Sequence, residues 1–273
     1  MAGGGQGEVT LNDGRRMPQL GLGVWRTPAE DAERVVAAAL DAGYRAVDTA
    51  SAYGNEEGVG RGLAGRDVFL TTKLWNSDQG YDEALRAFDA SAKRLGRESL
   101  DLYLIHWPAP RKGRFVDSWK ALVRLQKEGR ARSIGVSNFT EDHLARIIDE
   151  TGVTPAVNQI ELHPRFQQKA LRAFHAARGI LTESWSPLGQ GQLLADPSLA
   201  EIARRHGKTP AQVIIRWHLD SGLIVIPKTV NPARLTENVA VFDFALDAAD
   251  MERIAGLDTP EGRIGPDPMT ATF

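Results

Sequence analysis

The sequence predicts an α/β fold in which eight strands alternate with helices and close into a (β/α)8 TIM barrel with a short N-terminal β-hairpin. Short apolar runs alternate with longer segments of helical spacing along the chain. Because each run returns through a helix, the strands should be parallel, and eight parallel strands close into a barrel filled by side chains. No low-complexity linker divides the chain. We therefore expect residues 1–273 to form one domain, with residues 1–7 as a flexible tail.

The main alternative is a doubly wound open sheet, which normally carries a glycine-rich nucleotide-binding loop after its first strand. Here the first barrel strand ends in Gly21-Leu-Gly23-Val24-Trp25, and no G-x-G-x-x-G motif follows it. The sequence therefore favours the barrel.

The elements follow in order along the chain. Asn12-Asp13-Gly14 is a strong turn signal between the two hairpin strands, Val9–Leu11 and Arg16–Pro18. The predicted barrel strands are Leu20–Val24, Ala46–Asp48, Val68–Thr72, Leu102–His106, Ser133–Val136, Ala156–Gln159, Leu181–Ser184 and Ile224–Ile226. The clearest predicted helices are Ala32–Leu40, Ala84–Leu95, Ser118–Gln126, Leu144–Ile148, Leu171–Ala177 and Ala211–Leu219.

Composition narrows the class of protein. The formal charge of -2 gives no concentrated basic face for nucleic acid or a membrane surface. The longest apolar run, Val35–Leu40, is far too short to span a bilayer. The absence of cysteine excludes disulfides and thiolate sites and fits a reducing compartment. We expect a cytoplasmic monomer that binds neither nucleic acid nor membranes.

Polar and aromatic residues follow nearly every predicted strand, and in a barrel all these strand ends meet at one face. The second, third and fourth strands deliver Asp48 with Tyr53, Lys73 and His106. Each residue alone has an ordinary structural interpretation, but the set together favours a general acid whose pKa is adjusted by its neighbours. A lysine beside a tyrosine lowers the pKa of the phenol, and an aspartate keeps that lysine charged.

Several motifs then resemble one family. They are Asp48-Thr-Ala-Ser-Ala-Tyr53-Gly54-Asn55-Glu56, Thr72-Lys73-Leu74-Trp75, Leu104-Ile-His106-Trp107-Pro108, Ile134-Gly-Val-Ser-Asn138-Phe139, Asn158-Gln159-Ile-Glu-Leu-His163-Pro164, and Ile226-Pro-Lys-Thr229 with Arg234 and Asn238. Together they resemble the aldo-keto reductase superfamily from about Val9 to Leu257. Within that family the chain is most similar to the bacterial 2,5-diketo-D-gluconate reductases, in the motifs Asn55-Glu-Glu-Gly-Val-Gly60, Glu183-Ser-Trp-Ser-Pro-Leu-Gly-Gln-Gly191 and Glu237-Asn-Val-Ala-Val-Phe-Asp-Phe244.

The resemblance implies NADPH-dependent reduction of an aldehyde or ketone. Tyr53 would be the proton donor, Lys73 and Asp48 would support it, and His106 would orient the carbonyl oxygen. Diketo acids or keto sugars such as 2,5-diketo-D-gluconate are the expected small-molecule carbonyl substrates.

The resemblance also implies a long NADPH/NADP site. Ser137, Asn138 and Gln159 match the positions that bind the carboxamide, and Trp185 matches the ring that stacks on the nicotinamide. Lys228, Thr229 and Arg234 match the positions that bind the 2′-phosphate, where arginine can bind bidentately. The remaining expected cofactor contacts are Gly23, Val24, Trp25, Leu188, Gly189, Gln190, Gly191, Val230, Glu237 and Asn238.

We expect the substrate mouth to be aromatic and open, because only short loops surround it. Its expected lining is Trp25, Ala52, Trp75, His106 and Trp107.

Two other functions remain open from the residues. Lys73 could form a Schiff base, as in an aldolase, or the chain could bind the cofactor for regulation with little turnover. A metal enzyme is disfavoured, because the six histidines show no close metal-ligand spacing.

Overall fold

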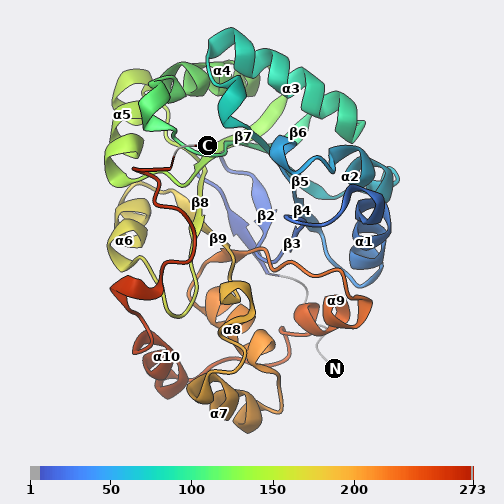
Figure 1. Ribbon diagram of the computed structural model, residues 1–273, viewed down its shortest axis with the longest axis vertical. Helices are drawn as coiled ribbons and strands as arrows, with labels where there is room; N and C mark the ends of the chain where they lie inside the picture. The colour runs from blue at the N-terminus through green and yellow to red at the C-terminus, as the bar shows by residue number, and fades with distance from the viewer. Residues whose placement is uncertain (1–6, 272) are drawn as a thin grey trace.

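The computed structural model describes residues 7–271 and 273, which form a closed barrel of eight parallel strands surrounded by helices (Figure 1). The barrel strands are β3 (Leu22–Gly23), β4 (Ala46–Asp48), β5 (Phe69–Leu74), β6 (Leu100–Ile105), β7 (Ala131–Ser137), β8 (Val157–Glu161), β9 (Leu181–Trp185) and β10 (Ile224–Val225). They pair in chain order from β3 to β10.

The barrel closes between β10 and the residues that immediately precede β3. Leu20 forms a parallel bridge with Val225, and the Gly21 N–H donates to the carbonyl oxygen of Val225 at 2.9 Å. These bonds complete the ring, so the predicted (β/α)8 fold is confirmed.

Helices form the outer layer of the molecule (Figure 1). They are α1 (Ala29–Asp41), α2 (Glu56–Leu63), α3 (Tyr81–Leu95), α4 (Phe115–Lys127), α5 (Glu141–Thr151), α6 (Lys169–Ala177), α7 (Pro197–His206), α8 (Pro210–Asp220), α9 (Pro232–Val239) and α10 (Ala248–Ala255). None of the helices within the described ranges is both long and apolar enough to cross a membrane.

The predicted hairpin is present as β1 (Glu8–Thr10) and β2 (Arg16–Pro18), paired antiparallel with Val9 opposite Met17. Leu11 and Met17 are buried against Leu102, Leu104 and other residues of the barrel interior. The hairpin therefore closes one end of the barrel, which leaves the carboxyl ends of the strands for a site. Gly7 joins this structure by accepting a hydrogen bond from the Gln19 N–H at 2.8 Å, while the rest of the predicted tail lies outside the described residues.

Helix α2 was not predicted, because Gly58, Gly60 and Gly62 interrupt its helical pattern. These glycines allow close contact with the neighbouring helices. A Cβ atom on Gly58 would lie 2.8 Å from the carbonyl oxygen of Ala29, and one on Gly62 would lie 2.7 Å from that of Glu33. The glycines that obscure the helical pattern in the sequence therefore allow α2 to pack closely against its neighbours.

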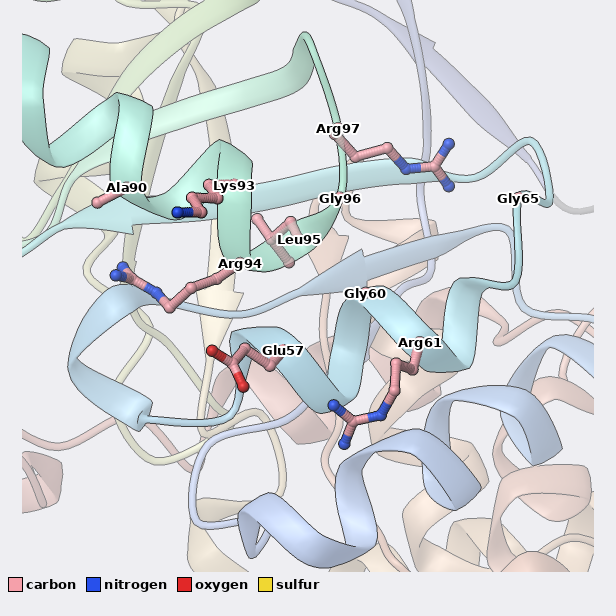
Figure 2. A pocket seen from close by; sticks show the side chains of 10 residues that line it. All are labelled: Glu57, Gly60, Arg61, Gly65, Ala90, Lys93, Arg94, Leu95, Gly96 and Arg97. Atoms are coloured by element: carbon pink, nitrogen blue, oxygen red, sulfur yellow. The ribbon is translucent and has the colours of Figure 1, made fainter.

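An open cleft of about 700 Å³ lies on the outside of the barrel between α2 and α3 (Figure 2). It is rich in cations, but Arg61 pairs with Glu33 at 2.7 Å and Arg94 pairs with Glu56 at 2.6 Å. These ion pairs bind the helices to one another. The polar residues at the barrel mouth are therefore the better candidates for a functional site.

Candidate active site

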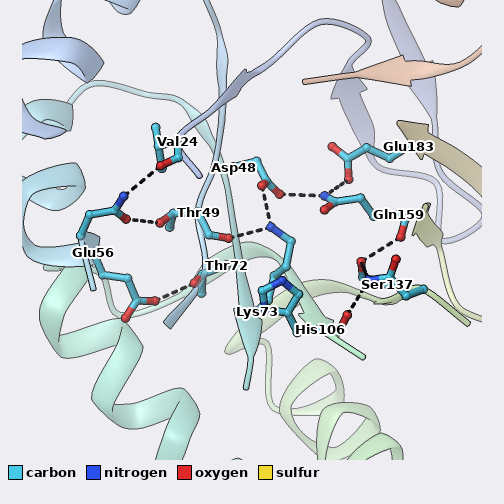
Figure 3. A network of polar contacts seen from close by, with 12 residues as sticks. Val24, Asp48, Thr49, Glu56, Thr72, Lys73, His106, Ser137, Gln159 and Glu183 are labelled. Carbon is cyan, nitrogen blue, oxygen red and sulfur yellow. Dashed lines mark hydrogen bonds and ion pairs between the residues drawn. The ribbon is translucent and has the colours of Figure 1, made fainter. Parts of the chain in front are cut away.

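Buried polar residues from four barrel strands are joined by hydrogen bonds inside the barrel (Figure 3). Asp48 ends β4, Lys73 lies near the end of β5, and Gln159 and Glu183 are cross-strand neighbours on β8 and β9. We call Asp48, Lys73, Gln159 and Glu183 the interior network.

Lys73 and Asp48 form a buried ion pair. The Lys73 ammonium donates to Asp48 Oδ1 at 2.6 Å and to the carbonyl oxygen of Thr49 at 2.9 Å, and its side chain is 0% exposed. Burial, the largest single effect, would lower the pKa of Lys73, but the charges of Asp48, Tyr53 and Glu183 and the hydrogen bond to Asp48 together outweigh burial, so the pKa is raised. Burial raises the pKa of Asp48, with Lys73 opposing this effect. Lys73 is therefore held as a charged ammonium pointing into the site.

Tyr53 stands beside this ammonium at the end of a short 3-10 turn, Ser51–Tyr53. The Lys73 Nζ atom lies 5.2 Å from the centroid of the Tyr53 ring. The turn is fixed on both sides, because the Ser51 hydroxyl donates to the carbonyl oxygen of Lys73 at 2.9 Å and the buried Asn55 amide donates to that of Val24 at 3.0 Å.

The direction of the Tyr53 pKa differs from the sequence expectation. Burial raises the pKa of the phenol, and the charge of Lys73 lowers it by less than burial raises it. The expectation of a net lowered pKa is therefore wrong for this structure, although Lys73 acts in the expected direction. The practical consequence is that Tyr53 keeps its proton and can act as a donor.

His106 completes the predicted tetrad. Its ring lies edge-on to Tyr53, with the two centroids 5.6 Å apart. Burial and the charge of Lys73 lower the pKa of His106 well below its usual range. The imidazole is therefore neutral at physiological pH, and its Nδ1 atom is buried without a hydrogen-bond partner among the described residues.

Ser137, Asn138 and Trp185 form a second connected group next to the tetrad. The Asn138 amide nitrogen donates to the carbonyl oxygen of His106 and to the Ser137 hydroxyl, both at 3.0 Å. The Trp185 indole N–H donates to Asn138 Oδ1 at 2.8 Å. Asn138 therefore links the half-buried indole ring to the backbone of His106.

Gln159 joins this group to the tetrad. Its backbone carbonyl accepts from the Ser137 hydroxyl at 2.8 Å, and its amide nitrogen donates to Asp48 Oδ2 at 2.9 Å. The same nitrogen donates to Glu183 at 2.8 Å. Sequence reasoning missed Glu183 as a site residue. The available signal was its place at the start of the Glu183–Gly191 motif, in a strand that also carries Thr182 and Ser184.

Backbone conformation shapes the loop after β9. The Leu188–Gly191 segment contains Gly189, Gln190 and Gly191, with φ values of 57°, 53° and 92°. Glycine adopts this left-handed region without strain, which lets the loop turn tightly at the rim of the barrel. Gly23 lies on β3, where a Cβ atom would be 2.7 Å from the carbonyl oxygen of Ile226. Its neighbour Val24 is buried, and the Val24 N–H donates to the carbonyl oxygen of Asp48 at 3.1 Å.

The loop after β10 presents free cations. Lys228 and Arg234 are both exposed, and no carboxylate of the described residues lies within ion-pair distance of either. Between them α9 begins, capped by the Asn231 side chain, which accepts from the Ala233 N–H at 2.9 Å. Thr229 is buried and its hydroxyl accepts from the Asn231 N–H at 3.2 Å, while Val230 is half-buried.

The last two expected cofactor contacts lie farther along α9. Glu237 accepts from the Thr209 hydroxyl at 2.7 Å, so its carboxylate ties α9 to α8. Asn238 is buried.

The mouth is aromatic, although its lining differs in part from the expected one. Phe273 stacks on Trp75, with centroids 5.7 Å apart and an interplanar angle of 11°, and meets Trp107 edge-on at 5.0 Å. Trp25 is 40% exposed and stacks instead with the guanidinium of Arg26 at 4.2 Å. Ala52 is exposed beside Tyr53. Sequence reasoning missed Phe273, because the last residues carry no motif.

This geometry can be compared with known proteins. A sequence model described as the Aldo/keto reductase family matches residues 17–259 of the chain. The chain belongs to the aldo/keto reductase family. The resemblance that the motifs indicated is therefore confirmed.

Individual aldo/keto reductases are similar over nearly the whole chain. A Mycolicibacterium smegmatis aldo-keto reductase is 62% identical over 97% of this chain and 98% of its own length. The methylglyoxal reductase DkgA of Salmonella typhimurium is 53% identical over 95% of this chain and 96% of its own. The crystal structure of a Gox0644 mutant in complex with NADPH is 59% identical, with a TM-score of 0.97 over 98% of this chain and 99% of that one.

Proposed function

We propose that the protein reduces aldehydes or ketones to alcohols with NADPH, and that Tyr53 supplies the proton. The observation that carries the proposal is the position of Tyr53, whose ring centroid lies 5.2 Å from the Lys73 ammonium at the mouth of an aldo/keto reductase barrel. Asp48, Tyr53, Lys73 and His106 are the proposed catalytic residues.

The residues around the mouth fit a nicotinamide cofactor, which would supply a hydride to the carbonyl carbon. The Asn138 amide and the Ser137 hydroxyl donate their hydrogen bonds to other protein groups. In contrast, no described residue donates to the side-chain oxygen of Gln159. That oxygen is therefore a free acceptor for an amide N–H group. The half-buried indole of Trp185 offers a flat apolar surface beside it.

The charges of the rim favour NADPH over NADH. Lys228 and Arg234 are exposed and lack a carboxylate partner within the described chain, so both are available for a phosphate. A guanidinium binds phosphate through two parallel hydrogen bonds, and the N-terminus of α9 adds N–H groups of favourable polarity. Gly23, Trp25 and the Leu188–Gly191 loop are proposed as further backbone and ring contacts of the cofactor.

In the reaction, Tyr53 donates its proton to the carbonyl oxygen as negative charge develops there. The Lys73 ammonium stabilises that charge and the phenolate left on Tyr53, because it is fixed by Asp48 and needs no reorganisation. The neutral His106 ring faces the same position and orients the carbonyl oxygen through a hydrogen bond. Solvent returns a proton to Tyr53 after the product leaves.

We propose small 2-oxoaldehydes and diketo acids as the substrate class. The relatives named methylglyoxal reductase DkgA support the first, and the motif resemblance to 2,5-diketo-D-gluconate reductases supports the second. The aromatic surface of Trp75 and Trp107 also suits an apolar carbonyl compound.

The two other functions have less support. A Schiff base needs a neutral lysine, whereas the raised pKa of Lys73 keeps its amine protonated and its side chain is fully buried. A regulatory cofactor-binding protein would have no use for the paired Lys73 and Asp48 beside Tyr53.

The test is NADPH oxidation with methylglyoxal, 2,5-diketo-D-gluconate and a panel of aldehydes and ketones, with NADH in parallel. We expect turnover with NADPH preferred. Tight NADPH binding without turnover across the panel would contradict catalysis and favour the regulatory function.

A further inference from the structure

Glu183 is the one fully buried acidic side chain of the interior network to which the reaction assigns no role. It lies on β9 with its carboxyl group inside the barrel, and Glu183 Oε2 accepts from the Gln159 amide nitrogen at 2.8 Å (Figure 3). Asp48 Oδ2 accepts from the same nitrogen at 2.9 Å. The amide nitrogen of Gln159 therefore lies between the carboxyl group of Glu183 on the adjacent strand β9 and that of Asp48 on β4.

This arrangement fixes which end of the amide faces inward. A primary amide has two N–H donors and one acceptor oxygen, and here both donors are used by Asp48 and Glu183. A rotation by half a turn would place the amide oxygen against the Asp48 carboxylate, which cannot donate, and would lose that hydrogen bond. With Asp48 alone, one N–H would lack its partner and the side chain could swing away.

We propose that Glu183 is a positioning residue, which together with Asp48 holds the nitrogen of Gln159 inward so that its amide oxygen is presented to the nicotinamide carboxamide. The inference rests on the proposed function, because it requires a nicotinamide cofactor in the site. It assigns a role to a side chain that touches neither substrate nor cofactor in the proposed reaction.

Burial and the surrounding charges determine the protonation state of Glu183. Glu183 contacts Gln159 of β8 and interacts electrostatically with Asp48 of β4, Lys73 of β5 and Tyr53, and Lys73 is the single cation among these groups. Burial raises the pKa of Glu183 to about 8, the Asp48 charge adds to this, and Gln159 and Lys73 oppose it. At neutral pH Glu183 is therefore a neutral acid that accepts from Gln159 without adding a second negative charge.

Direct NADPH binding tests the proposal without relying on turnover. The dissociation constant would be measured at pH 6.5 by quenching of tryptophan fluorescence for the wild type, Glu183→Met and Glu183→Gln. Glu183→Met removes the acceptor and should weaken NADPH binding by about tenfold, the effect of one buried hydrogen bond. Glu183→Gln keeps an acceptor oxygen of the same reach, so it should bind within about threefold of the wild type.

The matched control is Ser184→Ala. Ser184 is the adjacent buried residue of β9, and its hydroxyl has no hydrogen-bond partner in the described chain. This variant should bind NADPH as the wild type does. Wild-type affinity in Glu183→Met, or an equal loss in Ser184→Ala, would overturn the positioning role.

A double-mutant cycle separates positioning from a general structural effect. In a Gln159→Met background the amide is gone, so Glu183→Met should cause no further loss of NADPH affinity. The same tenfold loss in both backgrounds would show that Glu183 does not act through Gln159.

Should Glu183→Met fail to fold, Glu183→Asp takes its place, because the carboxyl group is then one methylene too short to reach Gln159. It should bind NADPH several-fold more weakly, and wild-type affinity would overturn the proposal.

The unfolding free energy of the cofactor-free protein gives an independent readout. Between pH 4.5 and about 8, folded Glu183 keeps a proton that the unfolded chain loses, so stability falls as pH rises through this window. Glu183→Gln should remove that part of the slope, and an unchanged slope would contradict the neutral acid. A wild type that binds no NADPH, but shows this Glu183-dependent slope, would refute the proposed function while leaving the buried network intact.

Discussion

The interior network and the outer surface of the barrel mouth differ in burial and in the pairing of their charges. In the interior, Asp48 and Lys73 are buried and form hydrogen bonds with one another and with neighbouring groups. At the surface, Lys228 and Arg234 are exposed and lack acidic partners in the described chain, and Phe273 is 46% exposed. We call Lys228, Arg234 and Phe273 the exposed rim.

The difference separates stability from recognition. A buried ion pair is costly to break, because removal of one partner leaves the other charge without compensation. An exposed cation without a partner contributes little to folding, and it can give its full interaction to a ligand. Substitutions in the interior should therefore change stability and chemistry together, whereas substitutions at the rim should change binding alone.

Tyr53→Phe should have the largest effect, and it tests whether chemistry can be removed from the interior without loss of stability. The variant deletes the proton donor and keeps the ring beside Lys73 and His106. We expect kcat to fall roughly 10²- to 10⁴-fold. NADPH oxidation gives the rate, and NADPH binding, measured by fluorescence, should stay close to wild type. Undiminished reduction would refute Tyr53 as the acid.

Lys73→Met should have the next largest effect. It leaves the buried Asp48 carboxylate without its 2.6 Å partner, so we expect a loss of about 3–5 kcal/mol in the free energy of unfolding, measured in urea. Lys228→Met is the matched exposed control and should change stability by less than about 0.5 kcal/mol. The double variant Asp48→Asn with Lys73→Met should recover part of the loss. Equal stability in the two single variants would remove the distinction between the regions.

The sequence predicted the barrel well because its evidence is local. Apolar runs that alternate with helical patterns identified every barrel strand, and the shift of β5 toward Leu74 is a boundary difference. Helix α2 was missed because close contact with α1 requires glycines, and such contacts cannot be read from spacing alone.

The residues that follow the strand ends were predicted from motifs, whereas the contacts of Glu183 and Phe273 were not. Lys73 and His106 carry motif signals, and the structure brings both next to Tyr53. The role of Glu183 depends on Asp48, which lies on β4 and far away in sequence. Phe273 stacks on Trp75, which is far away in sequence, and the two are brought together only in the folded chain. The net pKa of Tyr53 also depends on burial, which no sequence pattern measures.

The double variant Lys228→Ala with Arg234→Ala tests recognition at the exposed rim. Each charge-assisted hydrogen bond to phosphate is worth about 1.5–3 kcal/mol, so NADPH should bind roughly 10- to 100-fold more weakly after solvent screening is allowed for. The dissociation constant for NADH should change by less than about threefold, because NADH has no 2′-phosphate. Urea unfolding should match the wild type. An equal loss for both cofactors would place the two cations away from the 2′-phosphate.

Phe273→Ala should have the smallest effect and shows whether the rim also distinguishes substrates. Phe273 stacks on Trp75 and meets Trp107 edge-on, so its removal takes away one apolar surface of the mouth while both indoles remain. An aromatic contact is worth about 0.5–1.5 kcal/mol, so kcat/KM for an aromatic aldehyde should fall a few-fold. Methylglyoxal is too small to use that surface, and its kcat/KM should barely change. Met269→Ala is the control, since Met269 is a 50% exposed residue of the same C-terminal segment. A loss of the same size for both substrates, or a drop in unfolding free energy, would instead make Phe273 a structural part of the interior.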